Sequence, residues 1–269
     1  MNSAPINVRR FERAFTSVNP SRSIHNNPVT SHFFNAFSLL FPEGERFFIR
    51  NVLAFADAVE DENLRRDIRG FVRQESLHGN AHERMNANLE AHGFDSNLIL
   101  KTQNLIFRLF EEYGSRFFDP RFGLAITIAL EHFGSVWGEW VLDNPEYVEG
   151  CDDPARNLIL YHSIEEIEHK HVAFDVYKAA QGSEGLRLLG LAVSVGAMWG
   201  GGLLGAANLL YQDKSISFRD FAFGLIDISR RNFSLGIHLT KETLDYLSPD
   251  FHPRNKNTYK LAEEATQAL

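Results

Sequence analysis

Two short segments of the chain repeat one metal-ligand motif, Glu-x-x-His. The two copies are Glu75 to His78 and Glu166 to His169. This spacing places a carboxylate and an imidazole about one turn apart on the same face of a helix. A lone Glu precedes each pair in an apolar helical segment, Glu45 before the first and Glu131 before the second. The order is typical of a carboxylate-bridged dinuclear metal site inside a four-helix bundle.

Apolar residues continue each motif at helical spacing in both directions. The seam through the first motif reads Leu64, Ile68, Phe71, Glu75, His78, His82, Met85 and Leu89. Burying an ionised carboxylate costs several kcal/mol unless it is paired, neutralised or metal-bound. The four seams run through Glu45, Glu75, Glu131 and Glu166, and none carries a Lys or Arg close to these residues. Two divalent cations would instead balance the four negative charges. A solvated pair on a helix surface remains the alternative for a single motif, but it explains two motifs in register less well.

Further histidines lie one turn from these motifs. His162 shares a face with Glu166 and His169, so we expect it to be an additional ligand, the alternative being a core histidine. His82 follows His78 by four residues, and we expect it to lie beside the ligands or in the core. Glu168 points about 200° away from Glu166 on the helical wheel and is expected outside the metal cluster.

Composition excludes several classes of protein. The net charge is −8 and there is no basic run, which argues against nucleic-acid binding. The single cysteine, Cys151, excludes a disulfide framework, a cysteine-rich zinc site and a thiolate-bound iron–sulfur cluster, and it fits the cytoplasm. The first 20 residues contain no apolar run, so no signal peptide is expected.

The helical periodicity predicts an all-α protein, because no strand-like alternation rises above it. We expect a loosely packed N-terminal arm over 1–28, a ferritin-like four-helix bundle carrying the metals over 29–182, and a C-terminal helical extension over 183–269 packed on the bundle. Pro42 is expected to divide the first helix, and the tail after 254 is expected to be mobile. The predicted helices are 29–41, 42–60, 62–91, 97–113, 119–142, 154–180 and 217–246.

The segment 188–211 contains no charged side chain and is long enough to span a bilayer. It also carries Gly196-x-x-x-Gly200 and Gly201-x-x-x-Gly205, the spacing of closely packed helices. We favour a buried or interfacial helix that caps the bundle of a soluble or peripheral protein over a membrane-inserted span, and peripheral membrane contact through 188–211 is left open. The expected location is the cytoplasm, with membrane association left open.

Several segments resemble a bacterial family catalogued as predicted metal-dependent hydrolases, over nearly the whole chain from about residue 20. They are Phe41 to Phe48, Glu75 to His78, Ile164 to Tyr177 and Asp250 to Pro253. The ligand pattern also resembles ferritin-like di-iron proteins. With His162 added, its spacing is similar to that of the arylamine N-oxygenases. This resemblance implies a ligand set of Glu45, Glu75, His78, Glu131, His162, Glu166 and His169.

The leading hypothesis is a non-haem di-iron oxygenase or oxidase that acts on an apolar or aromatic small molecule. It requires O2, an external electron donor and two iron ions, with manganese or zinc as alternatives. Glu75 and Glu166 are the expected bridging and catalytic carboxylates, and some of the 23 Phe would line the substrate pocket. A homodimer is left open.

The alternative is a binuclear hydrolase of esters or phosphoesters, in which two metals activate water. His82 is its candidate catalytic acid–base group, and His132 is a second candidate. A ferritin-like metal-binding protein is the third hypothesis.

Overall fold

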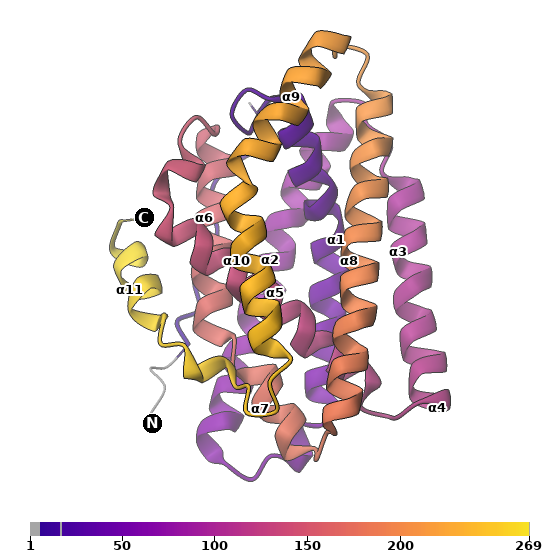
Figure 1. The fold of residues 1–269 in the computed structure, drawn as a ribbon, viewed down its shortest axis with the longest axis vertical. Helices are drawn as coiled ribbons and strands as arrows, with labels where there is room; N and C mark the ends of the chain where they lie inside the picture. The colour runs from indigo at the N-terminus through magenta and orange to yellow at the C-terminus, as the bar shows by residue number, and fades with distance from the viewer. Residues whose placement is uncertain (1–5, 17, 269) are drawn as a thin grey trace.

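The computed structural model describes residues 6–16 and 18–268, and these residues contain helices and no strand (Figure 1). The prediction of an all-α protein is confirmed, whereas the specific ferritin-like arrangement stays a prediction. The α-helices are α1 (Pro28–Leu53), α2 (Glu62–Ala91), α3 (Asn97–Leu109), α4 (Ser115–Phe117), α5 (Phe122–Asp143), α6 (Asp153–His169), α7 (Val172–Ala179), α8 (Glu184–Gln212), α9 (Phe218–Arg231), α10 (Phe233–Tyr246) and α11 (Tyr259–Ala268).

Four helices, α1, α2, α5 and α6, carry the predicted ligands, and α7 continues the direction of α6 after a break at Lys170 and His171. The predicted helix 154–180 is therefore two helices. Lys170 lies in this break, where its buried ammonium pairs with Glu139 at 2.9 Å. The predicted helix 217–246 is likewise divided, at Asn232 between α9 and α10.

The prediction that Pro42 divides the first helix is wrong, because α1 runs continuously from Pro28 to Leu53. A proline inside a helix leaves the carbonyl four residues earlier without its N–H partner. That carbonyl belongs to Ser38, and it accepts a hydrogen bond from the Asn86 side chain of α2 at 3.0 Å. A tertiary contact therefore replaces the missing helical bond.

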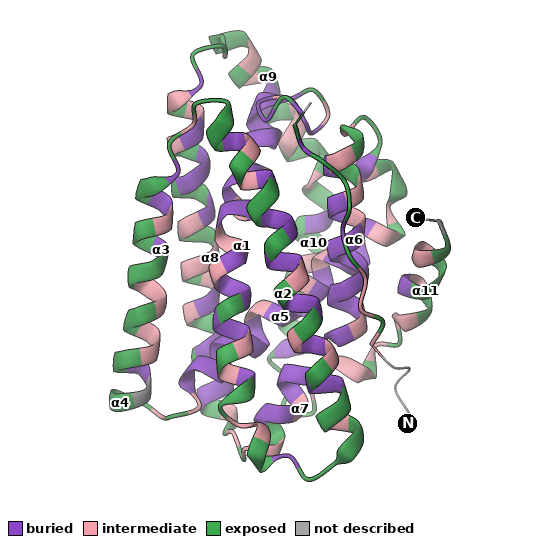
Figure 2. Cartoon of the chain, turned by 180° about the vertical axis from the view of Figure 1, so that it is seen from behind, coloured by how far each residue is buried: buried purple, intermediate pink, exposed green. Residues whose placement is uncertain are grey.

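The N-terminal segment is more tightly packed than we expected. Phe11, Phe15 and Val18 are buried against α2 and α6, where Met85 and Tyr161 belong to the same cluster. Figure 2 shows the chain crossing this side of the molecule before it reaches α1.

The C-terminal tail is also packed, contrary to the expectation that it is mobile. Ala262 of α11 is buried against Ile164 and Ile167 of α6. The division of the chain into arm, bundle and extension stays a prediction.

Helix α8 packs along α1 and α5, and its glycines allow a close approach. A Cβ at Gly190 would lie 2.4 Å from the Ala125 carbonyl oxygen, and one at Gly205 would lie 3.0 Å from the Ala36 Cβ. By contrast, a Cβ at Gly196 or Gly200 would meet no atom within 4 Å. The second predicted glycine pair therefore faces the bundle, and the first faces outward.

By length and composition alone, α8 could cross a membrane, and it is the one such helix in the described part of the chain. Only 28% of its most apolar 18-residue window is buried in the protein. A core helix of a soluble protein can pass the same test, so length and composition do not decide between the two predictions for this segment.

Candidate metal centre

The seven predicted metal ligands come together in the interior of the helical bundle. Each of them is at most 5% exposed. α1 supplies Glu45, α2 supplies Glu75 and His78, α5 supplies Glu131, and α6 supplies His162, Glu166 and His169. The residues that helical spacing in the sequence places on common faces therefore also lie together in the structure.

One group of side chains surrounds His169. Its Nε2 lies 3.1 Å from Glu75 Oε1, 3.3 Å from Glu131 Oε2 and 3.6 Å from Glu166 Oε2. An imidazole nitrogen and three carboxylates thus converge on one small volume.

A second group surrounds His78. Its Nδ1 lies 3.5 Å from Glu45 Oε1 and 3.9 Å from Glu166 Oε1, and His162 Nε2 lies 3.6 Å from the same Glu166 oxygen. The two oxygens of Glu166 therefore face different histidines. Glu75 also belongs to both groups, because its ligand atom lies within 4.8 Å of those of Glu45 and His78 and of those of Glu166 and His169.

Many polar atoms of this cluster are buried without a hydrogen-bond partner. They are both carboxylate oxygens of Glu45, Glu75 and Glu131, both ring nitrogens of His78, and Nε2 of His169. Each unsatisfied buried polar atom costs about 1–3 kcal/mol, so a protein would not retain so many in one place without a ligand. Mixed carboxylate and imidazole donors suit iron, manganese or zinc. The residues therefore fit a pair of divalent cations.

The electrostatics of the cluster lead to the same conclusion. Burial, together with the neighbouring carboxylates, raises the pKa of Glu45, Glu75 and Glu131 well above the ordinary value. Burial and the neighbouring imidazoles lower the pKa of His78 and His162 well below the ordinary value. Without cations these carboxyl groups resist ionisation, and bound cations would reverse this preference.

A hydrogen-bond chain orients His169. The side-chain nitrogen of Gln74 donates to Glu168 at 2.8 Å and to the Asn7 carbonyl at 3.0 Å, so its Oε1 faces His169 Nδ1 at 3.1 Å. His169 Nδ1–H therefore donates to Gln74, and the Nε2 lone pair is left to face the carboxylates. Such outer partners fix the tautomer of a metal-ligating histidine.

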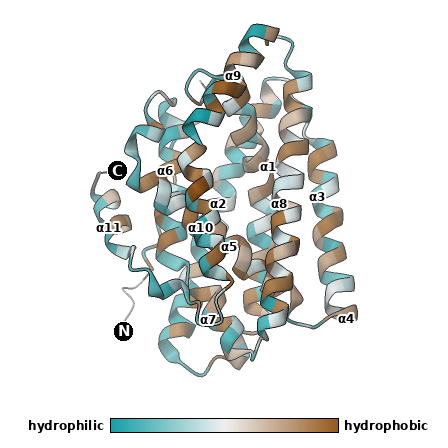
Figure 3. Cartoon of the chain, viewed as in Figure 1, coloured by the Kyte–Doolittle hydropathy of each residue, from teal (hydrophilic) through white to brown (hydrophobic). Residues whose placement is uncertain are grey.

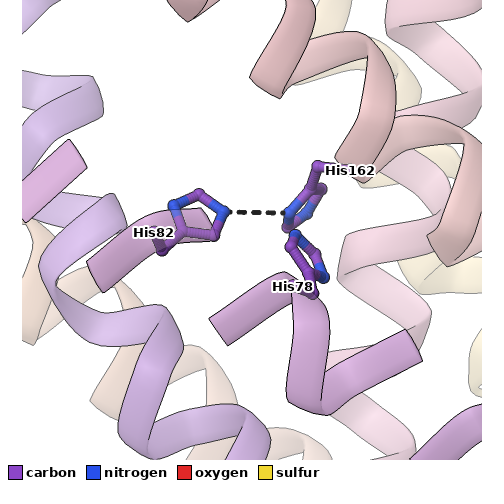
Figure 4. A group of neighbouring side chains, drawn as sticks. All are labelled: His78, His82 and His162. Atoms are coloured by element: carbon purple, nitrogen blue, oxygen red, sulfur yellow. Dashed lines mark hydrogen bonds between the residues drawn. The ribbon is translucent and has the colours of Figure 1, made fainter. Parts of the chain in front are cut away.

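A second hydrogen-bond chain orients His162, and Figure 4 shows its last link, from His82 to His162. The Ser38 hydroxyl donates to Asn86 Oδ1 at 2.9 Å, so its oxygen accepts from His82 Nδ1–H, also at 2.9 Å. Burial lowers the pKa of His82 to about 3, so its ring is neutral and Nε2 is an acceptor. His162 Nδ1–H then donates to His82 Nε2 at 3.4 Å, and His162 Nε2 faces Glu166.

Glu168 lies outside the cluster, where Arg9 binds it at 2.7 Å. It nevertheless acts on His169 through Gln74, which the sequence analysis did not identify. The helical wheel shows that Glu168 points away from the cluster, but it cannot show which residue of another helix lies between them.

Two glycines beside the ligands were also missed. A Cβ at Gly79 would lie 2.6 Å from Glu45 Oε2, and one at Gly134 would lie 2.2 Å from Glu166 Oε2. Gly79 follows Glu75 by four residues, and Gly134 follows Glu131 by three. A small residue one turn from a predicted ligand was therefore a usable signal in the sequence.

An apolar cavity of about 520 Å³ borders one side of the cluster. Of the seven predicted ligands, Glu45, His162 and Glu166 line it. Its aromatic lining residues are Phe33, Phe34, Phe37, Phe41, Phe48, Phe107, Phe110, Phe133, Trp137, Tyr147 and Trp199. The cluster therefore presents one face to a pocket that suits an apolar molecule.

Neither histidine that we offered as the acid–base group of a hydrolase lines this cavity. His82 contacts His162 and Ser38 instead, and this geometry favours a positioning role. His132 faces the Glu242 carbonyl at 3.2 Å, with its ring against Tyr246.

Residues 7–257 match the family described as predicted metal-dependent hydrolases. The chain belongs to this family. The predicted resemblance is thereby confirmed, and the family description agrees with the hydrolase alternative rather than with the oxidoreductase hypothesis. No curated protein and no solved structure matches the chain. A metal-dependent enzyme is the conclusion that the family and the His and Glu clusters support together.

Proposed function

We propose that this protein is a dinuclear metalloenzyme that uses O2 to oxidise an apolar small molecule. The observation that carries the proposal is the position of seven buried Glu and His side chains, many with unpartnered donor atoms, beside an apolar cavity. When bound, two iron ions would supply the oxygen-activating chemistry, and an external donor would supply electrons.

The distances support a division of labour among the ligands. Glu45, His78 and His162 would hold one cation, and Glu131 and His169 would hold the other. Glu75 and Glu166 would bridge the two, because each lies within reach of both groups.

The other residues act on the ligands and the substrate. Gln74 holds His169, and His82 holds His162, in the tautomer in which Nε2 carries no proton and can bind a cation. The aromatic wall excludes water and places an apolar substrate against Glu45, His162 and Glu166. The apolar lining suits oxidation of an apolar substrate, and Glu45 and Glu166 on the cavity wall could deliver the protons that reduction of O2 consumes.

A binuclear hydrolase is the second candidate, and the family description favours it. Two cations would activate water for attack on an ester or phosphoester. In that case Glu45 or Glu166 would have to move the proton, since neither His82 nor His132 lines the cavity. A hydrolase would work without O2 and with zinc or manganese, which separates the two candidates.

The test begins with elemental analysis of protein purified without chelator. Anaerobic Fe(II) loading and an O2 pulse, followed by absorbance, come next. We expect about two metal ions per chain and consumption of O2 by the iron-loaded protein. Two zinc or manganese ions, no reaction with O2 and anaerobic ester hydrolysis would instead establish the hydrolase. Iron far above two per chain would indicate metal storage.

A pair of variants tests the ligand assignment. Glu166→Ala should lose metal binding and O2 consumption, because Glu166 faces both groups. The matched control is Glu83→Ala, an exposed glutamate on α2 that pairs with Arg46. Retention of two metals by Glu166→Ala would contradict the assignment.

A further inference from the structure

The cavity extends along one face of α1. Its lining residues on this helix are Thr30, Phe33, Phe34, Phe37, Leu40, Phe41, Gly44, Glu45 and Phe48. From Thr30 to Phe48 the helix advances roughly 27 Å at 1.5 Å per residue. An apolar lining of that length can accommodate an extended hydrocarbon chain laid along α1.

The cavity opens between α3 and α8. Its exposed large apolar lining residues all lie on these two helices: Leu98 is 66% exposed, Leu204 is 72% exposed and Trp199 is 37% exposed. The mouth is therefore rimmed by large apolar side chains that face solvent.

Exposed apolar side chains of α3, α8 and α9 make up what we call the α3–α8–α9 face, and Figure 3 shows apolar residues along these three helices. Leu105 of α3 and Leu203 of α8 are each 57% exposed, and Phe218 at the start of α9 is 86% exposed. Gly196 and Gly200 on the outer side of α8 also face open space. Exposed apolar side chains gathered in this way are typical of an interaction site.

The charges on this face differ from those of the whole protein. The net charge of the chain is −8. Helices α3, α8 and α9 together carry six positive and three negative side chains, a net charge of +3: Lys101, Arg108, Arg187, Arg219, Arg230 and Arg231 against Glu184, Asp220 and Asp227. An apolar face with a net positive charge complements an anionic lipid surface.

We infer that the α3–α8–α9 face docks in the surface of an anionic lipid bilayer, and that a long-chain apolar substrate passes from the bilayer between α3 and α8 to the metal centre. This inference rests on the proposed function for the chemistry at the inner part of the cavity. A second copy of the chain on this face would cover the mouth, whereas a bilayer supplies an apolar substrate to it.

Flotation with vesicles tests the docking surface on the full-length protein. Vesicles of phosphatidylcholine with phosphatidylglycerol should carry the protein upward in a density gradient. The double variant Leu105→Glu, Leu203→Glu should bind at least about tenfold more weakly, since two exposed apolar side chains become charged. Leu53→Glu is the matched control, because Leu53 is 50% exposed at the end of α1 and lies outside this face.

A second variant pair addresses the charges without changing the apolar surface. Lys101→Ala and Arg108→Ala should each weaken binding to the anionic vesicles about fivefold, with little change for vesicles of phosphatidylcholine alone. Circular dichroism of every variant establishes that the helices are intact. Failure of the wild-type protein to float, or flotation of the Glu double variant equal to that of wild type, would overturn the inference. A stable dimer, detected by light scattering, that does not bind vesicles would also overturn the inference.

Tryptophan fluorescence tests the path into the cavity, because Trp137 and Trp199 line it. A brominated long-chain lipid should quench this fluorescence, and a short-chain brominated ester should not. Absence of quenching by the long chain would overturn the proposed path.

Metal analysis keeps this inference separate from the proposed function. Protein that floats but binds no metal would contradict the proposed function alone. Protein that binds two metals but does not float would contradict the docking surface alone.

Discussion

Gly134 allows a test of the proposed metal centre, because it lies against the predicted ligand Glu166 and is not itself a predicted ligand. An ideal Cβ at this position would lie 2.2 Å from Glu166 Oε2 and 2.7 Å from Glu166 Cδ. Non-bonded carbon atoms approach to about 3.5 Å. The Glu166 carboxylate must therefore move by about 1 Å in the variant Gly134→Ala.

The cost of this movement depends on whether metal is bound. In the metal-free protein the carboxylate is the flexible end of a side chain and can rotate away. Alanine is also favoured over glycine inside a helix by about 1 kcal/mol. We expect the metal-free variant to be at least as stable as wild type. With metal bound, a carboxylate oxygen must stay about 2.0–2.2 Å from the ion, and a 1 Å displacement removes that bond.

The assay compares metal affinity and thermal stability in the same samples. Gly134→Ala should bind metal roughly 100-fold more weakly, or hold only one ion, by analogy with the 10–100-fold effects of altered outer partners. Metal should then raise the melting temperature of the variant much less than that of wild type. The control is Gly236→Ala on α10, where a Cβ meets no atom within 4 Å. It should gain about 2–4 °C and keep both metals. Unchanged metal affinity in Gly134→Ala would refute the assigned position of Glu166.

Three further predictions concern the surroundings of the ligands. Gln74→Leu leaves His169 Nδ1–H without its acceptor and should lower metal affinity about 10–100-fold, which titration calorimetry measures. Ser38→Ala should disturb His162 through His82, and a changed absorption spectrum of the cobalt-substituted protein would reveal it; an unchanged spectrum would contradict the chain of hydrogen bonds. Between the ordinary carboxyl pKa of 4.5 and their raised pKa in the folded protein, the carboxyls of Glu45, Glu75 and Glu131 should make the metal-free protein less stable as pH rises, because they stay protonated when folded and ionise when unfolded. The free energy of unfolding should fall by about 1.4 kcal/mol per pH unit for each such group, which urea unfolding measures. The metal-loaded protein should not show this fall.

The cluster of seven Glu and His side chains could be predicted from the sequence because helical spacing alone determines which residues share a face, whereas their role as ligands stays a prediction. Glu75 and His78 are on one turn whatever the rest of the fold does, and the same holds for Glu166 and His169. The upstream Glu45 and Glu131 could be added because a buried carboxylate needs a counter-charge.

The remaining parts of the site depend on contacts between distant segments, which periodicity does not encode. Gln74 binds His169 across 95 residues and Glu168 across 94. The cavity mouth is formed by α3 and α8, which lie far apart in the sequence and which no predicted motif connects. The packing of the N-terminal segment was missed because Phe11, Phe15 and Val18 are buried although the chain forms no helix over 6–16, and their spacing of four and three residues does not show which helices cover them.

Pro42 connects an error in the predicted fold with the chemistry of the site. Because proline has no N–H, the Ser38 carbonyl is free to bind the Asn86 amide nitrogen. This contact turns Asn86 Oδ1 toward the Ser38 hydroxyl, which then has only its oxygen to offer His82. The neutral His82 ring in turn accepts from His162 and leaves His162 Nε2 to face Glu166. The sequence feature that was read as a helix break therefore sets the direction of a hydrogen-bond chain that ends at the metal centre, which gives a reason for a proline inside a ligand-bearing helix.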